Sequence, residues 1–298
     1  MRRTGRRAPA RVLSALGLYA GVGLFLAYVL LPVVWMVISS ILVETDFIRL
    51  SSELILPRRI QLGYYQALLM PWRTQQIEYG VSAAYGTFLL EALRDTTIVA
   101  TSVAAGTVLL GSLAAYAFAR LRFPGRMALV RAYIVVQMIP GLAVLIPLFI
   151  VIRGWNLVDT YPGYILPLTA FFTPFVAWMM LGFIQSIPRE LEEAAQVDGC
   201  SPLGALARIV LPLSAQGLIA SLVWAFLSAW SELMFALVLT GTRVKPVSVV
   251  VSLGVGEIQA RWGFMSAQAV LTLLVPLALA LVFQRYLVKG LTAGAVTG

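Results

Sequence analysis

Few side chains in this chain could carry out covalent chemistry. The chain has no histidine, which excludes Ser-His-Asp and Cys-His nucleophile pairs, histidine proton relays and HExxH zinc sites. Its one cysteine, Cys200, cannot form an internal disulfide or a cysteine-rich metal site. Neither lysine, Lys245 or Lys289, lies in a phosphate-binding P-loop. The sequence therefore predicts a chain without a catalytic centre, metal site or nucleotide site of its own.

One carboxylate lies within a strongly apolar stretch, Glu232 in the segment WAFLSAWSELMFAL. A charge at that depth in a membrane costs at least ~2.5 kcal/mol, so it should face a cavity or the interior of a helical bundle. Glu232 could bond the hydroxyls of a solute along a pathway, or it could form an ion pair with another helix. The other side chains expected along the same pathway are Trp230, Trp224, Gln137 and Gln268.

The most informative pattern is the polar segment SIPRELEEAAQVDGCSPLGALARIVLP, residues 186–212, which we call the elbow. Three glutamates near its start suit the positive end of a helix dipole. Gly199 lies where a left-handed helix stop is expected, and Ser201 followed by Pro202 is typical of an N-cap and first helical residue. The pattern predicts two short helices joined at a glycine. On this evidence alone, the elbow could be an amphipathic hairpin on a bilayer surface.

The composition indicates that the elements around these residues lie in a membrane. Of 298 residues, 60% are hydrophobic and 12% are charged, about half the ~25% usual in soluble domains. With a mean hydropathy of +0.90, a soluble protein would expose apolar patches large enough to aggregate. The net charge of +9 then points to topology and not to nucleic-acid binding, because cytoplasmic loops carry an excess of Lys and Arg.

Six stretches reach the ~20 mostly apolar residues that a membrane-spanning helix needs. They are residues 16–42, 96–119, 132–152, 163–184, 217–240 and 265–287. The first follows the basic start MRRTGRRAPAR and is too long for the core of a cleaved signal peptide, so we expect a retained span. The expected fold class is an all-α integral membrane protein with six transmembrane helices and a helix–Gly–helix loop.

The distribution of basic residues predicts the orientation. If the N-terminus is cytoplasmic, 13 of the 22 basic residues lie on the cytoplasmic side. The short loop RLRFPGR is basic, whereas GWNLVDTYPG has no basic residue. Both termini and the elbow are therefore expected in the cytoplasm, and residues 43–95, 153–162 and 241–264 outside.

The elbow resembles the EAA signature of binding-protein-dependent ABC importer permeases. Seven fixed residues agree over twenty positions, from Glu193-Ala194-Ala195 through Gly199 to Leu211-Pro212. The resemblance implies that the elbow is the coupling helix, seated against an ATPase subunit. The residues that it implies for coupling are Glu193, Ala194, Ala195, Asp198, Gly199, Ile209, Leu211 and Pro212.

The resemblance extends from about residue 88 to the end of the chain. The segments LAAYAFARLRFPGR and MIPGLAVLIPLFIVIRGWNLVDTYPGYILP and the tail FQRYLVKGLTAGAVTG are similar to the sugar-importing, MalG-like branch. Two departures fall on the expected outer side, where they would affect substrate or binding-protein specificity. Asp95-Thr96 replaces the usual Asn-Ser, and residues 71–86 look like an insertion.

This resemblance implies a non-catalytic permease subunit in the cell (inner or plasma) membrane, which forms half of a pathway for an oligo- or disaccharide. The implied partners are a second, homologous permease, two ABC ATPases that bind ATP and Mg²⁺, an extracytoplasmic sugar-binding protein and membrane lipid, with no nucleic acid. No cofactor is expected in this chain. The implied organisation is a basic cytoplasmic N-terminus (1–15), a first span with an external segment (16–95), a five-helix core that includes the elbow (96–288) and a cytoplasmic tail (289–298).

Three alternatives are open. A permease of the same fold could carry another solute, such as glycerol phosphate or a polyamine. An ion-coupled secondary carrier is a second reading, disfavoured by the lack of histidine and the single deep carboxylate. A scaffolding membrane protein is the third, and it would leave the EAA spacing unexplained.

Overall fold

The computed structural model describes residues 7–43, 47, 60–70, 84–252 and 261–293, and within these ranges its regular elements are all helices. In lipid, a helix satisfies the hydrogen bonds of its backbone N–H and C=O groups within one segment, which suits a chain that crosses a membrane. The chain divides into two compact units, one of Met1–Tyr85 with Gly254–Leu271 and one of Gly86–Leu253 with Thr272–Gly298. Most of the 71–86 segment, expected to be an insertion, lies outside the described residues.

The first unit contains α1 (Arg7–Ser39), α3 (Gly63–Leu69) and the beginning of α14 (Trp262–Ala293). The ring of Tyr64 meets Phe264 edge-on, with the ring centroids 6.0 Å apart. A Cβ at Gly263 would lie 2.7 Å from the Tyr64 ring and 2.9 Å from the Leu42 carbonyl oxygen. The absence of a side chain at Gly263 is therefore what lets these segments approach closely.

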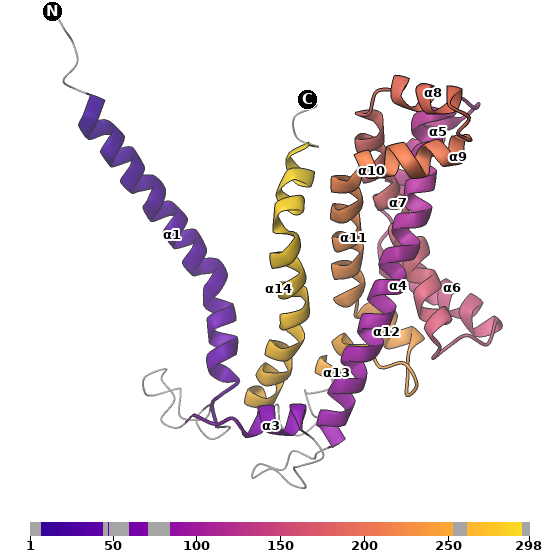
Figure 1. Ribbon diagram of the computed structural model, residues 1–298. Coiled ribbons are helices and arrows are strands. Elements are labelled where there is room, and N and C mark those ends of the chain that lie inside the picture. The colour runs from indigo at the N-terminus through magenta and orange to yellow at the C-terminus, as the bar shows by residue number, and fades with distance from the viewer. Residues whose placement is uncertain (1–6, 44–46, 48–59, 71–83, 253–260, 294–298) are drawn as a thin grey trace, which may run out of the picture. The chain divides into compact units, whose positions relative to one another are not determined.

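The second unit is built around two long helices, α4 (Ala84–Arg120) and α7 (Tyr161–Gln185) (Figure 1). They approach closely at Gly111, where a Cβ would lie 2.7 Å from the Val176 side chain. Small residues allow such close packing between membrane helices. The described remainder of the unit, apart from its share of α14, consists of α5 (Arg126–Val136), α6 (Gly141–Gly154), α8 (Glu190–Val197), α9 (Pro202–Ala205), η2 (Leu206–Val210), α10 (Leu211–Leu213), α11 (Ala215–Trp230), α12 (Met234–Leu239) and α13 (Val247–Ser252).

Four described helices are long and apolar enough to cross a membrane, and there are up to six spans if two bent helix pairs each count as one. The four windows are Ala15–Ser39, Phe88–Arg120, Tyr161–Gln185 and Trp262–Tyr286. The bent pairs are Arg126–Val136 with Gly141–Gly154, at 99°, and Pro202–Leu213 with Ala215–Trp230, at 82°. The all-helical membrane fold expected from the sequence is thus confirmed, with four to six spans.

Three predicted spans differ from the helices observed. The 132–152 stretch is not one helix, because α5 ends before Pro140, which precedes α6 and has no N–H to continue the helix. The 217–240 stretch is interrupted at residues 231–233, between α11 and α12. The 96–119 stretch is part of a longer helix that begins at Ala84, because hydropathy detects only the apolar part of a helix. By contrast, α7 is continuous despite Pro167 and Pro174.

Candidate functional site

The elbow has two helical limbs, the first formed by α8 (Glu190–Val197) and the second by α9, η2 and α10 (Pro202–Leu213). The first limb ends at Gly199, as the sequence predicted. Gly199 has φ of +91°, which is the left-handed conformation that glycine adopts at low cost. The Cys200 N–H donates to the Ala195 carbonyl at 2.9 Å, and the Gly199 N–H donates to the Gln196 carbonyl at 3.0 Å. These two bonds form a Schellman motif, which satisfies the last carbonyls of α8 and reverses the chain.

The second limb begins with the predicted cap. The Ser201 hydroxyl accepts a hydrogen bond from the Gly204 N–H at 3.1 Å, and Pro202 occupies the first helical turn. The helix widens into a π-helical turn at Leu206–Val210 and returns to α geometry at Leu211–Leu213. The chain then bends by 82° into α11. The elbow therefore consists of two short helical limbs that directly precede the N-terminus of the apolar helix α11.

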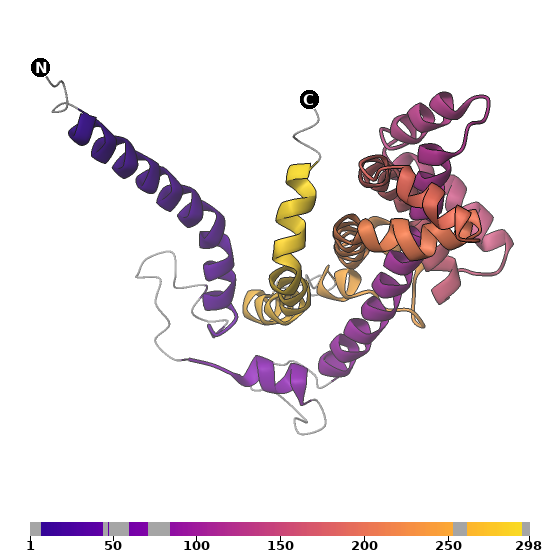
Figure 2. The same cartoon turned by 45° about the horizontal axis from the view of Figure 1, so that its top comes forward.

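The elbow lies beside the C-terminal end of α4 (Figures 1 and 2), and polar contacts tie the two together. The Arg120 guanidinium donates to the Glu192 carboxylate, and both side chains are less than a tenth exposed. Arg120 also donates to the Ile187 carbonyl at 2.8 Å. In the reverse direction, Arg189 donates to the Ala119 carbonyl at 2.9 Å. Both limbs are attached, since the Tyr116 hydroxyl donates to the Pro202 carbonyl at 3.2 Å.

The residues expected to couple lie mainly on the free side of the elbow. Glu193, Ala194, Asp198, Gly199 and Pro212 are exposed, Ile209 and Leu211 are half-buried, and Ala195 is buried. Large apolar side chains accompany them, with Leu191 46%, Val197 89% and Leu203 65% exposed. A surface that combines exposed apolar side chains with carboxylates fits a partner protein better than bulk water.

Glu192 is a site residue that the sequence did not single out. The signature drew attention to its neighbour, Glu193, which is exposed and whose carboxylate makes no hydrogen bond or ion pair within the described part of the chain. The available signal was helical spacing, because Glu192 lies three residues before the buried Ala195 and therefore on the same face of α8. A charge on a buried face requires a partner, and Arg120 is that partner.

A second set of polar contacts lies in the N-terminal half of α4, at Asp95 and Thr96. The buried Asp95 carboxylate accepts from the Tyr161 hydroxyl at 2.9 Å and from the Lys245 N–H at 3.1 Å. The Thr96 hydroxyl accepts from the Val247 N–H at 2.8 Å. The two residues that depart from the family pattern therefore hold the 245–247 segment and α7 against α4.

Asp159 holds the neighbouring loop in a similar way. Its carboxylate accepts from four consecutive backbone N–H groups, those of Gly241, Thr242, Arg243 and Val244, at 2.8–3.0 Å. Burial raises the pKa of Asp159, but these four donors outweigh burial and hold the pKa below its ordinary value. Two segments that the basic-residue count assigned to the same side, 153–162 and 241–264, are thus in direct contact.

Glu232 lies in the break between α11 and α12 and is half-buried. Its carboxylate accepts from the Phe235 N–H at 3.1 Å, so it caps the first turn of α12. Its backbone carbonyl accepts from the Ser248 hydroxyl at 2.7 Å and from the Tyr164 hydroxyl at 3.4 Å. The carboxylate has no ion pair in the described part of the chain. The ion-pair alternative therefore finds no partner among these residues.

The structure brings two of the other expected pathway residues to one aromatic cluster. The half-buried Trp224 lies 4.1 Å from Phe175 between ring centroids, and Gln137 donates to the Phe171 carbonyl at 3.2 Å. Phe171 and Phe172 link them, because Phe172 packs edge-on against Trp224. Trp230 is buried and stacks on Phe226, and Gln268 is buried in the first unit.

Comparison with known proteins places these features in a family. Residues 107–293 match the family described as "Binding-protein-dependent transport system inner membrane component". The chain is 33% identical to the trehalose transport system permease protein SugB of Mycobacterium tuberculosis, over 92% of this chain and 95% of that protein. It is also 33% identical to the trehalose/maltose transport system permease protein MalG of Thermococcus litoralis, over 96% and 98% of the two chains.

The fold also resembles a solved structure. A chain of a bacterial ABC transporter involved in the import of the acidic polysaccharide alginate superposes with a TM-score of 0.74. The match covers 96% of this chain and 99% of that chain at 19% sequence identity. At this level of identity the similarity concerns the fold.

The buried ion pair of the elbow leads to a prediction with an internal control. Replacing Glu192 by Ala would leave Arg120 buried without its carboxylate, and we expect the free energy of unfolding to fall by about 3–5 kcal/mol. Replacing the exposed Glu193 by Ala should change it by less than about 0.5 kcal/mol. Thermal unfolding of the two purified variants in the same detergent measures the difference. Equal unfolding temperatures would show that the pair does not hold the elbow.

Proposed function

The chain belongs to the family of binding-protein-dependent transport system inner membrane components, and from this premise we propose that it is the permease subunit of an ABC importer for a di- or oligosaccharide. The names of two relatives that match over nearly their whole length, trehalose and trehalose/maltose permeases, support this solute class. The observation that carries the coupling role is the elbow, which is fixed to α4 by buried contacts and leaves five of its eight expected coupling residues exposed, namely Glu193, Ala194, Asp198, Gly199 and Pro212.

The proposed assembly follows from the absence of a nucleotide site in this sequence. Two ATPase subunits would supply ATP hydrolysis, a second permease would complete the pathway, and an extracytoplasmic binding protein would deliver the sugar. Support comes from the family description, which names binding-protein-dependent transport. A bacterial alginate ABC transporter of similar fold (TM-score 0.65, 16% identity) was solved in complex with an alginate pentasaccharide-bound periplasmic protein. A permease for glycerol phosphate or a polyamine is the alternative, and uptake measured with a panel of solutes would separate the two.

We further propose six membrane crossings, with both termini and the elbow in the cytoplasm. The two bent helix pairs supply the fifth and sixth crossings, and the basic loop at residues 120–126 supports the orientation. Ser201→Cys in a Cys200→Ser background should react with a membrane-impermeant maleimide only after the cells are permeabilised. Arg243→Cys in the same background should react in intact cells. Labelling of Ser201→Cys from outside would reverse the proposed orientation.

Glu232 is proposed to face the translocation pathway at the break between α11 and α12, where its carboxylate caps the first turn of α12. Its half-buried side chain, whose carboxylate has no ion pair in the described chain, supports this role. Glu232→Gln keeps an oxygen that can cap α12 but removes the charge, whereas Glu232→Ala removes both. We expect both variants to assemble and to lower sugar uptake by about tenfold, the effect of losing roughly 1.4 kcal/mol of interaction.

Basal ATPase activity and the amount of assembled complex are the controls for Glu232. If the Gln variant transports normally and only the Ala variant fails, the carboxylate acts as a helix cap and not in the pathway. Failure of both variants to assemble would equally assign Glu232 a structural role.

The coupling role is tested at Gly199. Apart from the two adjacent residues, no atom of the described part of the chain lies within 4 Å of a Cβ placed there, so a side chain would project into the space that the ATPase is proposed to fill. Gly199→Val adds bulk and backbone strain, because φ is +91°. Gly199→Asn adds bulk with little strain, since asparagine tolerates left-handed backbone. We expect both variants to lower uptake and ATPase co-purification about tenfold or more.

The comparison between these variants separates docking from folding of the turn. Glu193→Lys, which reverses an exposed charge on the same surface, should give the same loss. A defect confined to the Val variant would mean that only the turn itself is sensitive. Wild-type uptake and ATPase co-purification in all three variants would exclude coupling through the elbow and favour the hairpin lying on the bilayer surface.

A further inference from the structure

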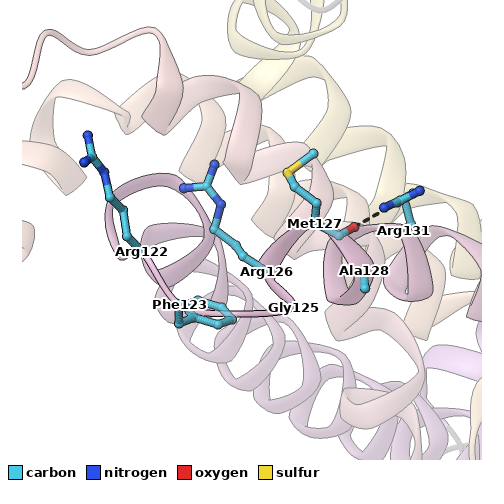
Figure 3. A pocket seen from close by; sticks show the side chains of 7 residues that line it. All are labelled: Arg122, Phe123, Gly125, Arg126, Met127, Ala128 and Arg131. Atoms are coloured by element: carbon cyan, nitrogen blue, oxygen red, sulfur yellow. Dashed lines mark hydrogen bonds between the residues drawn. The ribbon is translucent and has the colours of Figure 1, made fainter.

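A basic pocket lies beside the loop that joins α4 to α5, separate from the residues of the elbow signature. It has a volume of about 550 Å³ and is lined by Arg122, Phe123, Gly125, Arg126, Met127, Ala128 and Arg131. Figure 3 shows the side chains of Arg122 and Arg126 extending in the same direction from the loop, with Arg131 one turn further along α5. Three guanidinium groups thus come from ten consecutive residues around one hollow.

These arginines are not neutralised within the described part of the chain. The Arg126 guanidinium donates to the Leu121 carbonyl at 3.4 Å and Arg131 donates to the Met127 carbonyl at 3.2 Å, both neutral backbone groups. No described carboxylate lies within ion-pair distance of Arg122, Arg126 or Arg131. Glu192, on the neighbouring elbow, already forms an ion pair with Arg120.

The backbone adds to the positive potential of the pocket. Gly125 adopts φ of +82° and directs the chain into α5, whose first residue is Arg126. No side chain caps this helix N-terminus, and α5 has no acidic residue in its first turn. The partial positive charge of the helix end is therefore added to the three arginines.

The surroundings of the pocket are apolar. Leu121, Met127 and Leu129 are each about half exposed, and none of the residues of α5 is buried. An excess of cytoplasmic arginine needs no hollow and no apolar rim, so the positive-inside rule alone does not account for the arrangement. Three unpaired guanidinium groups above exposed apolar side chains match a ligand with an anionic head and a hydrocarbon body.

We propose that this pocket binds the phosphate of an anionic phospholipid from the surrounding bilayer. The guanidinium groups of Arg122 and Arg126 donate to the phosphate oxygens. Each can donate two parallel N–H bonds to one phosphate, whereas a lysine ammonium binds phosphate as a point charge. Arg131 stands one turn along α5, and Met127 and Ala128 contact the glycerol and upper acyl chain. The proposal rests on the membrane location of the chain and is independent of the solute.

The test uses the full transporter complex reconstituted in phosphatidylcholine vesicles with a trace of photoactivatable phosphatidylglycerol. After irradiation, we expect mass spectrometry to find the cross-linked lipid on the peptide that contains residues 121–131. Excess unlabelled phosphatidylglycerol should abolish the cross-link, whereas inorganic phosphate at millimolar concentration should not. This measurement on the unmodified chain does not depend on whether any variant folds.

Two double variants of equal charge provide the comparison. Arg122→Gln/Arg126→Gln should weaken phosphatidylglycerol binding about thirtyfold, since each arginine near the surface contributes about fivefold. Arg153→Gln/Arg243→Gln removes two exposed arginines elsewhere on the same unit and should leave binding unchanged.

Three results would overturn the proposal. The first is an equal loss of binding in the two double variants, which would indicate a general charge effect. The second is competition by inorganic phosphate as effective as that by the lipid, which would indicate a site for the free anion. The third is a cross-link distributed over the chain with no enrichment at residues 121–131.

Discussion

A buried ion pair at the end of α4 fixes the position of the elbow. Isolated charges are expensive to bury, and Arg120 and Glu192 are tolerated because each supplies the other's counter-charge and Arg120 also bonds the Ile187 carbonyl. The two hydrogen bonds fix the orientation of the Arg120 guanidinium, because it donates to the Glu192 carboxylate and to the Ile187 carbonyl at the same time. The free face of the elbow, with Glu193, Ala194 and Asp198, is exposed because this inner face is held.

The N-terminal half of α4 and the neighbouring Asp159 use the same physical principle with different donors. Asp95 and Thr96 accept from Tyr161 and from backbone N–H groups of the 245–247 segment, and Asp159 accepts four N–H groups of the adjoining turn. In both places, loop backbone that would otherwise lack partners is satisfied by a side chain from a distant part of the sequence. The second unit is therefore a packed set of helices whose loops are bonded to α4 at its C-terminal end and in its N-terminal half.

Local features of the chain were predictable from the sequence. The left-handed stop at Gly199 and the cap at Ser201 depend on residues within one turn, and both are present as expected. The helical membrane character follows from composition. Contacts between residues far apart in sequence left no comparable pattern: Glu192 pairs with Arg120, and Asp159 binds a loop eighty residues later. The break at Glu232 was missed for a different reason. Hydropathy is averaged over a window, so Ser231, Glu232 and Leu233, the three residues that interrupt the helix, did not stand out from the apolar residues around them.

The uninterrupted length of α4 has a mechanical consequence. Its 37 residues contain no proline and, at 1.5 Å per residue, extend about 55 Å, well beyond the ~30 Å hydrocarbon layer. A straight helix of that length behaves as a lever. Rotation of α4 by only 5° about the elbow end would carry the other end sideways by about 5 Å. The turns bonded to Asp95 and Thr96, which lie about 25 residues from Arg120, would move by about 3 Å, so a small rotation at one end of the helix becomes a displacement of several ångströms toward the other.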